Sequence, residues 1–237
     1  MPTYLYAITK ADHPLHLDTL KGVGEPSAPL RSVAFKTLAA VVSDAPEGLR
    51  AKRRDVLAHQ GVLEQLSTEG AALPMRFGIV GPSDDAVLAA LREQHDPYAR
   101  RLDELDGCIE YNLKASRDEH DLLREILAGS ERIRELNELT RYGSAAHEDR
   151  MALGELIAGE VSAREGEANR ALTSRLAASA LRVSPADPPK GSFLNVSFLL
   201  KRDDAPAFSE AVHGEAERLG DAYHLTLNGP LPPYSFV

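Results

Sequence analysis

The side chains that could bind a metal or act as nucleophiles are scattered along this chain. Eight histidines and one cysteine occur in 237 residues, and only His13 and His16 lie close together. A metal site needs three or four converging ligands, and no third histidine or cysteine lies near this pair. We therefore interpret both as surface loop histidines. Cys108 begins a predicted strand without a motif around it, which favours a buried structural thiol over a nucleophile.

Motifs for phosphate binding and for acid–base chemistry are also weak. The segment Gly22-Val-Gly24 lacks the third glycine and the strand-to-helix context of a dinucleotide site. Aspartates and glutamates are numerous, but they fall on predicted helical faces where solvation explains them. We therefore expect no cofactor, no metal and no catalytic residue, while a catalytic pair of carboxylates stays open as an alternative.

Arg76 is the charged residue whose position is hardest to explain. It lies between Met75 and Phe77 in an otherwise apolar stretch. The simpler interpretation is an arginine that faces solvent or pairs with a glutamate. The alternative is a charge that anchors a partner or a neighbouring domain, with Gly78 allowing another backbone to approach closely. Arg76, Phe77 and Gly78 are thus candidate contact residues.

The C-terminal residues 230–237 form a second candidate contact segment. Its prolines hold the backbone near polyproline II, and Tyr234, Phe236 and Val237 supply apolar anchors. The simpler interpretation is a tail that docks on its own domain, and the alternative is a peptide offered to a partner. The candidate contact residues of this tail are Pro230, Pro232, Pro233 and Tyr234.

Composition excludes several classes of function. The net charge is −9 and the isoelectric point is near 5.4. An acidic chain is unsuited to general nucleic-acid binding and to adhesion on anionic membranes, which both need an excess of basic residues. We find no apolar stretch of about 20 residues that could span a bilayer. The lone cysteine and the absence of a signal-peptide pattern predict a soluble, cytoplasmic protein.

Residues 1–116 are predicted to form an α+β domain. We expect strands at 4–8, 38–43, 72–80 and 107–115, helices at 50–70 and from Ser83 to about Leu105, and a loop at 22–32. Pro97 should kink or break the second helix. This order fits a ferredoxin-like sheet with helices on one face.

Residues 117–237 are predicted to form a C-terminal α+β domain with long helices. We expect helices at 118–140 and 147–182, separated by residues 142–145, a proline-rich linker at 184–191, a strand at 193–200, a helix at 203–219 capped by Asp203 or Asp204, and a strand at 223–227. The apolar stripe of the second long helix should pack on its own chain. A partner-binding coiled coil is the alternative.

Four motifs together resemble the GvpF/GvpL gas vesicle family. They are Leu73-Pro-Met-Arg-Phe-Gly-Ile-Val80, Leu105-Asp-Gly-Cys-Ile-Glu-Tyr-Asn-Leu-Lys114, Asn195-Val-Ser-Phe-Leu-Leu200 and Leu227-Asn-Gly-Pro-Leu-Pro-Pro-Tyr-Ser-Phe-Val237. The resemblance covers essentially the whole chain. Leu231 stands where the family usually has tryptophan, and the usual Pro-Leu-Arg-Phe-Gly-Thr reads Pro-Met-Arg-Phe-Gly-Ile here. The loss of tryptophan weakens a partner-binding role for the tail.

The resemblance implies a non-enzymatic protein needed to build gas vesicles. Family members are minor structural components or assembly factors thought to bind the hydrophobic shell protein GvpA and other accessory proteins. The implied location is the cytoplasm and the gas vesicle, and the implied fold pairs a ferredoxin-like domain with an α+β domain of long helices. The resemblance does not separate F-like from L-like members, nor does it imply an oligomeric state. The alternative is a small-molecule-binding or enzymatic ferredoxin-like protein with a site near Arg76.

Overall fold

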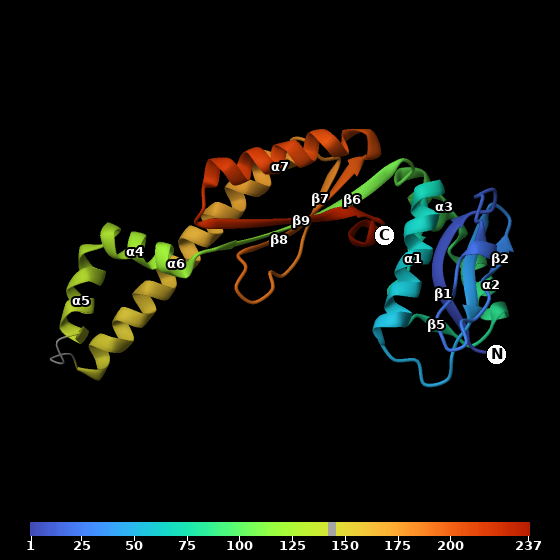
Figure 1. Ribbon diagram of the computed structural model, residues 1–237, viewed down its shortest axis with the longest axis horizontal. Helices are drawn as coiled ribbons and strands as arrows, with labels where there is room; N and C mark the ends of the chain where they lie inside the picture. The colour runs from blue at the N-terminus through green and yellow to red at the C-terminus, as the bar shows by residue number, and fades with distance from the viewer. Residues whose placement is uncertain (142–145) are drawn as a thin grey trace. The chain divides into compact units, whose positions relative to one another are not determined.

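The computed structural model describes residues 1–141 and 146–237, so the predicted break at 142–145 lies outside the described residues. The chain forms two compact units of helices and antiparallel strands (Figure 1). The first unit holds residues 1–110, 199–202 and 229–237, and the second holds residues 111–198 and 203–228. The C-terminal tail thus belongs to the first unit, and the predicted domain boundary at residue 116 stays a prediction.

An antiparallel sheet forms the centre of the first unit. Its strands are β1 (Thr3–Lys10), β2 (Arg31–Phe35), β3 (Leu38–Asp44), β4 (Ala72–Pro74) and β5 (Val80–Gly81). They follow the order β2-β3-β1-β4, and β5 also pairs with β1. Strand β2 was missed because its apolar run is only three residues long and it is an edge strand that alternates half-buried and exposed residues. The single strand predicted at 72–80 is wrong, since residues 75–79 leave the β ladder between β4 and β5.

Helices cover both faces of this sheet, not one face as predicted. Helix α1 (Arg53–Glu69) packs Val62, Leu63 and Leu66 against the face that carries Tyr4 and Tyr6. Helices α2 (Asp84–Glu93) and α3 (His95–Glu104) pack on the opposite face. Strand β3 is buried on both faces over Leu38–Ser43, which a one-sided sheet would not require.

The break predicted at Pro97 is confirmed. Helix α2 ends at Glu93 and α3 begins at His95. Proline has no backbone N–H and its ring clashes with the carbonyl four residues earlier, which here belongs to Glu93. A continuous helix through this position is therefore disfavoured, and the chain turns at Gln94 so that Leu91 and Leu102 can both reach the sheet.

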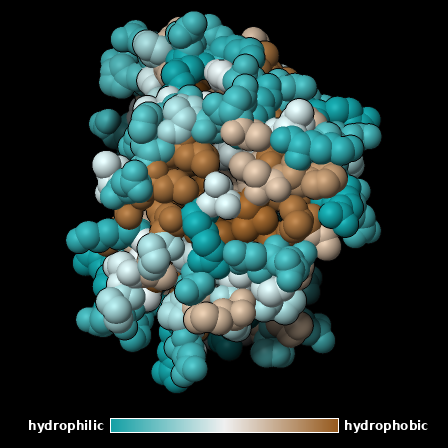
Figure 2. All heavy atoms as spheres, turned by 90° about the vertical axis from the view of Figure 1, so that its right-hand side faces the viewer, coloured by the Kyte–Doolittle hydropathy of each residue, from teal (hydrophilic) through white to brown (hydrophobic). Residues whose placement is uncertain are grey.

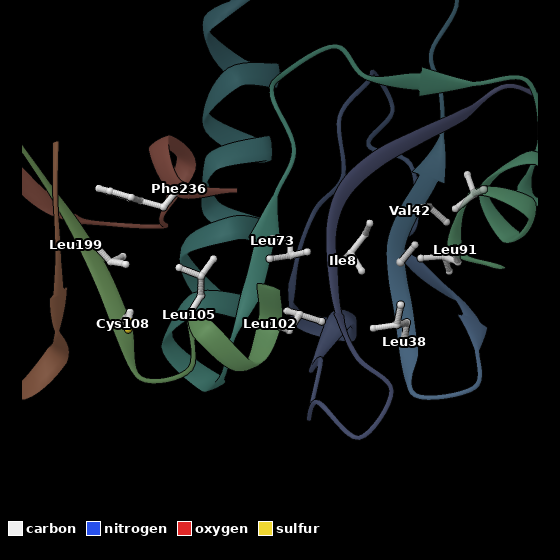
Figure 3. Close-up of a cluster of buried hydrophobic side chains, with 12 residues drawn as sticks. Ile8, Leu38, Val42, Leu73, Leu91, Leu102, Leu105, Cys108, Leu199 and Phe236 are labelled. Carbon is white, nitrogen blue, oxygen red and sulfur yellow. The ribbon is translucent and has the colours of Figure 1, made fainter. Parts of the chain in front are cut away.

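The larger apolar core of the first unit joins segments far apart in the sequence. Figure 3 shows Ile8, Leu38 and Leu73 of the sheet together with Leu91 and Leu102 of the two helices. Leu105 and Cys108 extend the same cluster, as do Leu199 and the next-to-last residue, Phe236. Cys108 is 7% exposed, which confirms the predicted buried thiol.

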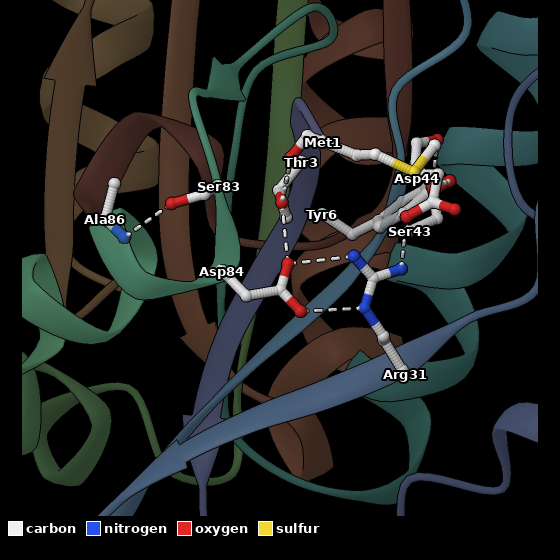
Figure 4. A network of polar contacts seen from close by, with 9 residues as sticks. All are labelled: Met1, Thr3, Tyr6, Arg31, Ser43, Asp44, Ser83, Asp84 and Ala86. Carbon is white, nitrogen blue, oxygen red and sulfur yellow. Dashed lines mark hydrogen bonds and ion pairs between the residues drawn. The ribbon is translucent and has the colours of Figure 1, made fainter.

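A polar network ties the edge strand to this core (Figure 4). The Arg31 guanidinium donates to both carboxylate oxygens of Asp84, at 2.9 and 2.8 Å, and pairs with Asp44 at 2.9 Å. The Thr3 hydroxyl donates to Asp84 Oδ1 at 2.6 Å. These hydrogen bonds, that of Arg31 above all, lower the pKa of Asp84 to about 2. Asp84 therefore stays ionised at the positive N-terminus of α2 and joins β2, β1 and α2.

The second unit contains most of a four-stranded sheet, although the ends of three strands are assigned to the first unit. The strands of this sheet are β6 (Cys108–Arg117), β7 (Arg182–Pro185), β8 (Leu194–Lys201) and β9 (Tyr223–Leu231), in the order β7-β8-β6-β9. Helix α7 (Ala205–Leu219) places Phe208 against Phe198 of β8, with ring centroids 5.1 Å apart. Asp204 is the N-cap residue of α7, as predicted, although its side chain accepts no capping hydrogen bond. The backbone of Asp204 is already helical, because it ends a 3₁₀ turn.

Three further helices form a bundle in the second unit. They are α4 (Glu119–Gly129), α5 (Glu131–Arg141) and α6 (His147–Ala177). The helix predicted at 118–140 is interrupted at Ser130, whose extended backbone and side-chain oxygen begin α5. Leu122, Ile126 and Ile133 pack with the apolar stripe of α6, as expected for a stripe that contacts its own chain. The predicted linker at 184–191 starts inside β7, so it is shorter than expected.

Among the described residues, no helix is both long enough and apolar enough to cross a bilayer.

Candidate functional site

The predicted contact residues Arg76, Phe77 and Gly78 lie in the turn between β4 and β5. Gly78 has a φ of 93°, a left-handed conformation that favours glycine, so the turn depends on this residue type. The Phe77 ring packs against Tyr4 and His59, with centroids 6.0 and 5.7 Å away. Arg76 is exposed and forms no ion pair or side-chain hydrogen bond with any described residue. The structure thus shows the solvent-facing arginine and not the pairing with a glutamate.

A buried histidine holds this turn in place. His59 is 3% exposed, and its Nε2 lies 3.0 Å from the Met75 carbonyl oxygen while Nδ1 lies 2.9 Å from the Tyr4 hydroxyl. The Gly78 N–H donates to the same hydroxyl at 3.2 Å. The neutral ring fits when Nε2–H donates to Met75 and Nδ1 accepts from Tyr4. Burial lowers the pKa of His59, which favours this neutral form.

Sequence reasoning missed His59, although a signal was present. The residue lies three and four positions before Val62 and Leu63, which places it on the buried face of α1. A histidine on an apolar helical face must find hydrogen-bond partners, because an unpaired buried ring nitrogen is costly. The partners are the hydroxyl of Tyr4 and the carbonyl of Met75, which no local pattern could identify.

An open apolar groove lies beside this turn. Its first hollow has a volume of about 300 Å³ and is lined by the sheet, by α2 and by the turn before β5. The lining residues are Leu5, Ile8, Ala40, Met75, Ile79–Pro82, Ala86, Val87, Ala90, Leu91 and Tyr98. A second hollow, of about 380 Å³, is lined by Leu73–Arg76, Ile79, Pro97, Tyr98, Arg101 and Val237. The two hollows share Met75, Ile79 and Tyr98, so we call them together the apolar groove.

The groove is accessible and carries few charges. Figure 2 shows apolar side chains gathered in a patch, framed by hydrophilic ones, on the side of the molecule where α2 and β5 lie. Ile79 and Val80 are 45% and 44% exposed. Among the described residues that line the groove, the only charged side chains are Arg76 and Arg101, with no carboxylate side chain and no histidine. This lining suits an apolar partner better than a reacting substrate.

The C-terminal tail docks on its own unit, as the simpler interpretation held. Phe236 is 3% exposed within the core that contains Leu73 and Leu199. Glu110 accepts hydrogen bonds from the Ser235 N–H at 2.8 Å and from the Ser235 hydroxyl at 2.7 Å. Tyr234 packs against the buried cluster that includes Tyr4 and Leu63, and burial raises the pKa of Tyr234 to about 12. These contacts hold the tail on its own unit, while Val237 stays 52% exposed.

The backbone of the tail differs from the predicted polyproline II segment. Strand β9 runs through Pro230 to Leu231, and a 3₁₀ turn occupies Tyr234–Phe236. Pro232 and Pro233 are buried whereas Pro230 is exposed. Glu110 is 3% exposed, although carboxylate side chains mostly face solvent. The tail covers this carboxylate, and a contact between residues 125 positions apart has no local signal.

A polar hollow of about 470 Å³ elsewhere in the first unit includes Gly24 and Asp55. Asp55 is 4% exposed and accepts a hydrogen bond from the Gly24 N–H at 2.9 Å, which lowers its pKa. Glu25 pairs with Arg54. These carboxylates are thus engaged in fixing the loop before β2, and neither has the raised pKa of a general acid.

The two neighbouring histidines contact the C-terminal end of α1. His16 Nδ1 lies 2.7 Å from Glu69 Oε1, and His13 Nε2 lies 3.0 Å from the Leu66 carbonyl oxygen. Across residues 1–141 and 146–237, no cluster of three histidine, cysteine, aspartate or glutamate side chains has the arrangement of a metal site.

Residues 2–237 match the family model described as gas vesicle synthesis protein GvpL/GvpF. Gas vesicle protein F of Streptomyces sp. (strain CB03234) is 46% identical over the full length of both chains. Gas vesicle protein L of the same strain is 27% identical, over 99% of this chain and 92% of that protein.

The fold is also shared with solved structures. The crystal structure of GvpF from Microcystis aeruginosa superposes with a TM-score of 0.82 at 24% identity, covering 99% of this chain and 98% of that one. GvpF from Anabaena sp. PCC7120 gives a TM-score of 0.85 at 22% identity, with 99% and 97% covered. With the whole-length family match and the 46% identical relative, these findings show that the chain belongs to the GvpL/GvpF family of gas vesicle synthesis proteins.

Proposed function

We propose that this chain serves gas vesicle assembly by protein–protein contact, without catalysis, and that it binds the hydrophobic shell protein GvpA and other accessory proteins. The observation that carries this proposal is the apolar groove, whose rim exposes Ile79 and Val80. Family membership supplies the vesicle context.

The physical case rests on the contrast between the groove and the rest of the chain. The chain is acidic, which favours solubility, while the groove offers apolar surface to a partner. A shell subunit with an apolar wall surface would aggregate when free in water. A soluble protein that covers part of that surface would hold the subunit until it joins the vesicle wall.

The alternative of an enzyme or small-molecule site near Arg76 has less support. An enzyme site would bring titratable groups together in a cleft. The lining beside Arg76 consists of apolar side chains and a second arginine, Arg101, which pairs with Glu104 at 2.9 Å. The carboxylates Glu25 and Asp55 of the polar hollow already have partners.

Co-purification of the shell protein with the tagged full chain tests the proposal. We expect soluble GvpA to be retained by the wild-type chain and lost with Ile79→Asp, because a charge in the groove must be desolvated. Leu57→Asp is the matched control, since Leu57 is 54% exposed on α1 and does not line the groove. No recovery of GvpA with the wild-type chain, or equal losses with both variants, would contradict the proposal.

A further inference from the structure

The charged side chains among the described residues that line the apolar groove all have the same sign. In a chain with a net charge of −9, the charged side chains among the described lining residues are Arg76 and Arg101. Arg101 donates to Glu104 Oε2 at 2.9 Å, so part of its charge is already matched. Arg76 is exposed and has no ion-pair partner among the described residues. The groove therefore has an apolar floor and one unmatched positive charge at its rim.

The Arg76 backbone is held in place before any partner arrives. The neighbouring Met75 carbonyl oxygen accepts a hydrogen bond from the His59 ring N–H, and the Gly78 N–H donates to the Tyr4 hydroxyl. Phe77 is fixed by ring contacts with Tyr4 and His59. A turn that is ordered on both sides of Arg76 reduces the entropy lost when the guanidinium binds a partner. Arginine also offers a planar donor set that matches a carboxylate.

We propose that the apolar groove binds an amphipathic segment of a partner protein, and that an aspartate or glutamate next to the apolar face of this segment pairs with Arg76. The inference rests on the proposed function and names the chemistry that the partner must have. Two adjoining hollows that share Met75, Ile79 and Tyr98 can each receive an apolar side chain of the same segment. The unmatched charge at the rim selects an acidic residue beside them and disfavours a basic one.

Binding of overlapping peptides from GvpA to the full-length chain tests this inference at low and high salt. We expect the bound peptides to contain an aspartate or glutamate within an apolar stretch. Arg76→Glu should weaken their binding about tenfold, because an attraction becomes a repulsion at the rim. High salt should weaken binding to the wild-type chain but strengthen binding to this variant, because screening then relieves a repulsion. Arg53→Glu is the control, since Arg53 is exposed at the start of α1 and does not line the groove.

A charge swap makes the test specific. Replacing the acidic residue of the bound peptide by lysine should weaken binding to the wild-type chain about tenfold as well, and should restore binding to Arg76→Glu. Unchanged affinity for Arg76→Glu, with Ile79→Asp still disruptive, would overturn the inference and leave the proposed function intact. If the wild-type chain binds neither GvpA nor any of the peptides, the inference and the proposed function are both overturned. Capture of anionic phosphatidylserine vesicles through Arg76, without peptide binding, would overturn the inference in favour of a lipid surface.

Discussion

Truncation of Phe236 should destabilise the first unit strongly, although the residue is next to the last in the chain. Its ring is 3% exposed and belongs to the core of Leu73, Leu105 and Leu199 (Figure 3). Buried phenylalanine-to-alanine changes cost about 3–5 kcal/mol of the free energy of unfolding. A chain end can shift to fill part of the cavity, so we expect Phe236→Ala to cost about 3 kcal/mol, at the lower end of that range.

Urea unfolding followed by circular dichroism measures this cost, because the chain has no tryptophan for fluorescence. If the two units unfold in separate steps, the step of the first unit should shift to lower urea. Val237→Ala is the control. Val237 is 52% exposed, so its truncation should change the free energy of unfolding by less than about 0.5 kcal/mol. A loss below about 1 kcal/mol for Phe236→Ala would refute the docked tail.

Three further changes test separate parts of the fold. Asp84→Asn should lower the free energy of unfolding by about 1 kcal/mol, a value reduced because Asp84 and Arg31 are partly exposed. The pKa of Asp84 is lowered in the folded chain. Its contribution is therefore present above about pH 4 and is lost as the pH falls towards 2. Thermal unfolding across this range checks it, and an equal acid response in the variant would contradict it. His59→Phe should cost about 2–4 kcal/mol in urea unfolding, because the Met75 carbonyl and the Tyr4 hydroxyl lose their partner. Because the pKa of His59 is lowered in the folded chain, its contribution to the free energy of unfolding is complete above about pH 6.5 and shrinks as the pH falls. Acidification should therefore destabilise the wild-type chain more than the variant. Ile126→Ala should lower the free energy of unfolding of the second unit by about 3 kcal/mol, because Ile126 is 0% exposed. Hydrogen exchange of the α4 amides should then become faster. Unchanged exchange would contradict a core at this position.

The elements that sequence patterns predicted well have strong local signals. Strands β1 and β8 are runs of buried apolar residues, and Pro97 breaks its helix through a steric conflict within one turn. Strand β2 was missed because it lacks such a run and gains its order from pairing with β3. The interruption at Ser130 was missed because a single serine capping a new helix hardly changes the helical periodicity.

The candidate site was only partly predictable from the sequence. Arg76 and Gly78 were singled out because their residue types are unusual in an apolar stretch, and the structure places them in a turn between two short strands. The apolar groove could not be predicted, because Leu5, Ile79 and Tyr98 meet only in the folded unit. The contacts of Glu110 and His59 likewise join segments whose pairing depends on the tertiary fold.

Hydrogen exchange of the full-length chain, with and without GvpA, tests the central claim most directly. If the apolar groove binds the shell protein, the amides of residues 79–81 and of α2 should exchange more slowly in the complex. Those of α4 and α5 in the second unit should remain unchanged. Protection confined to α4 and α5, with no change around Ile79, would contradict the account.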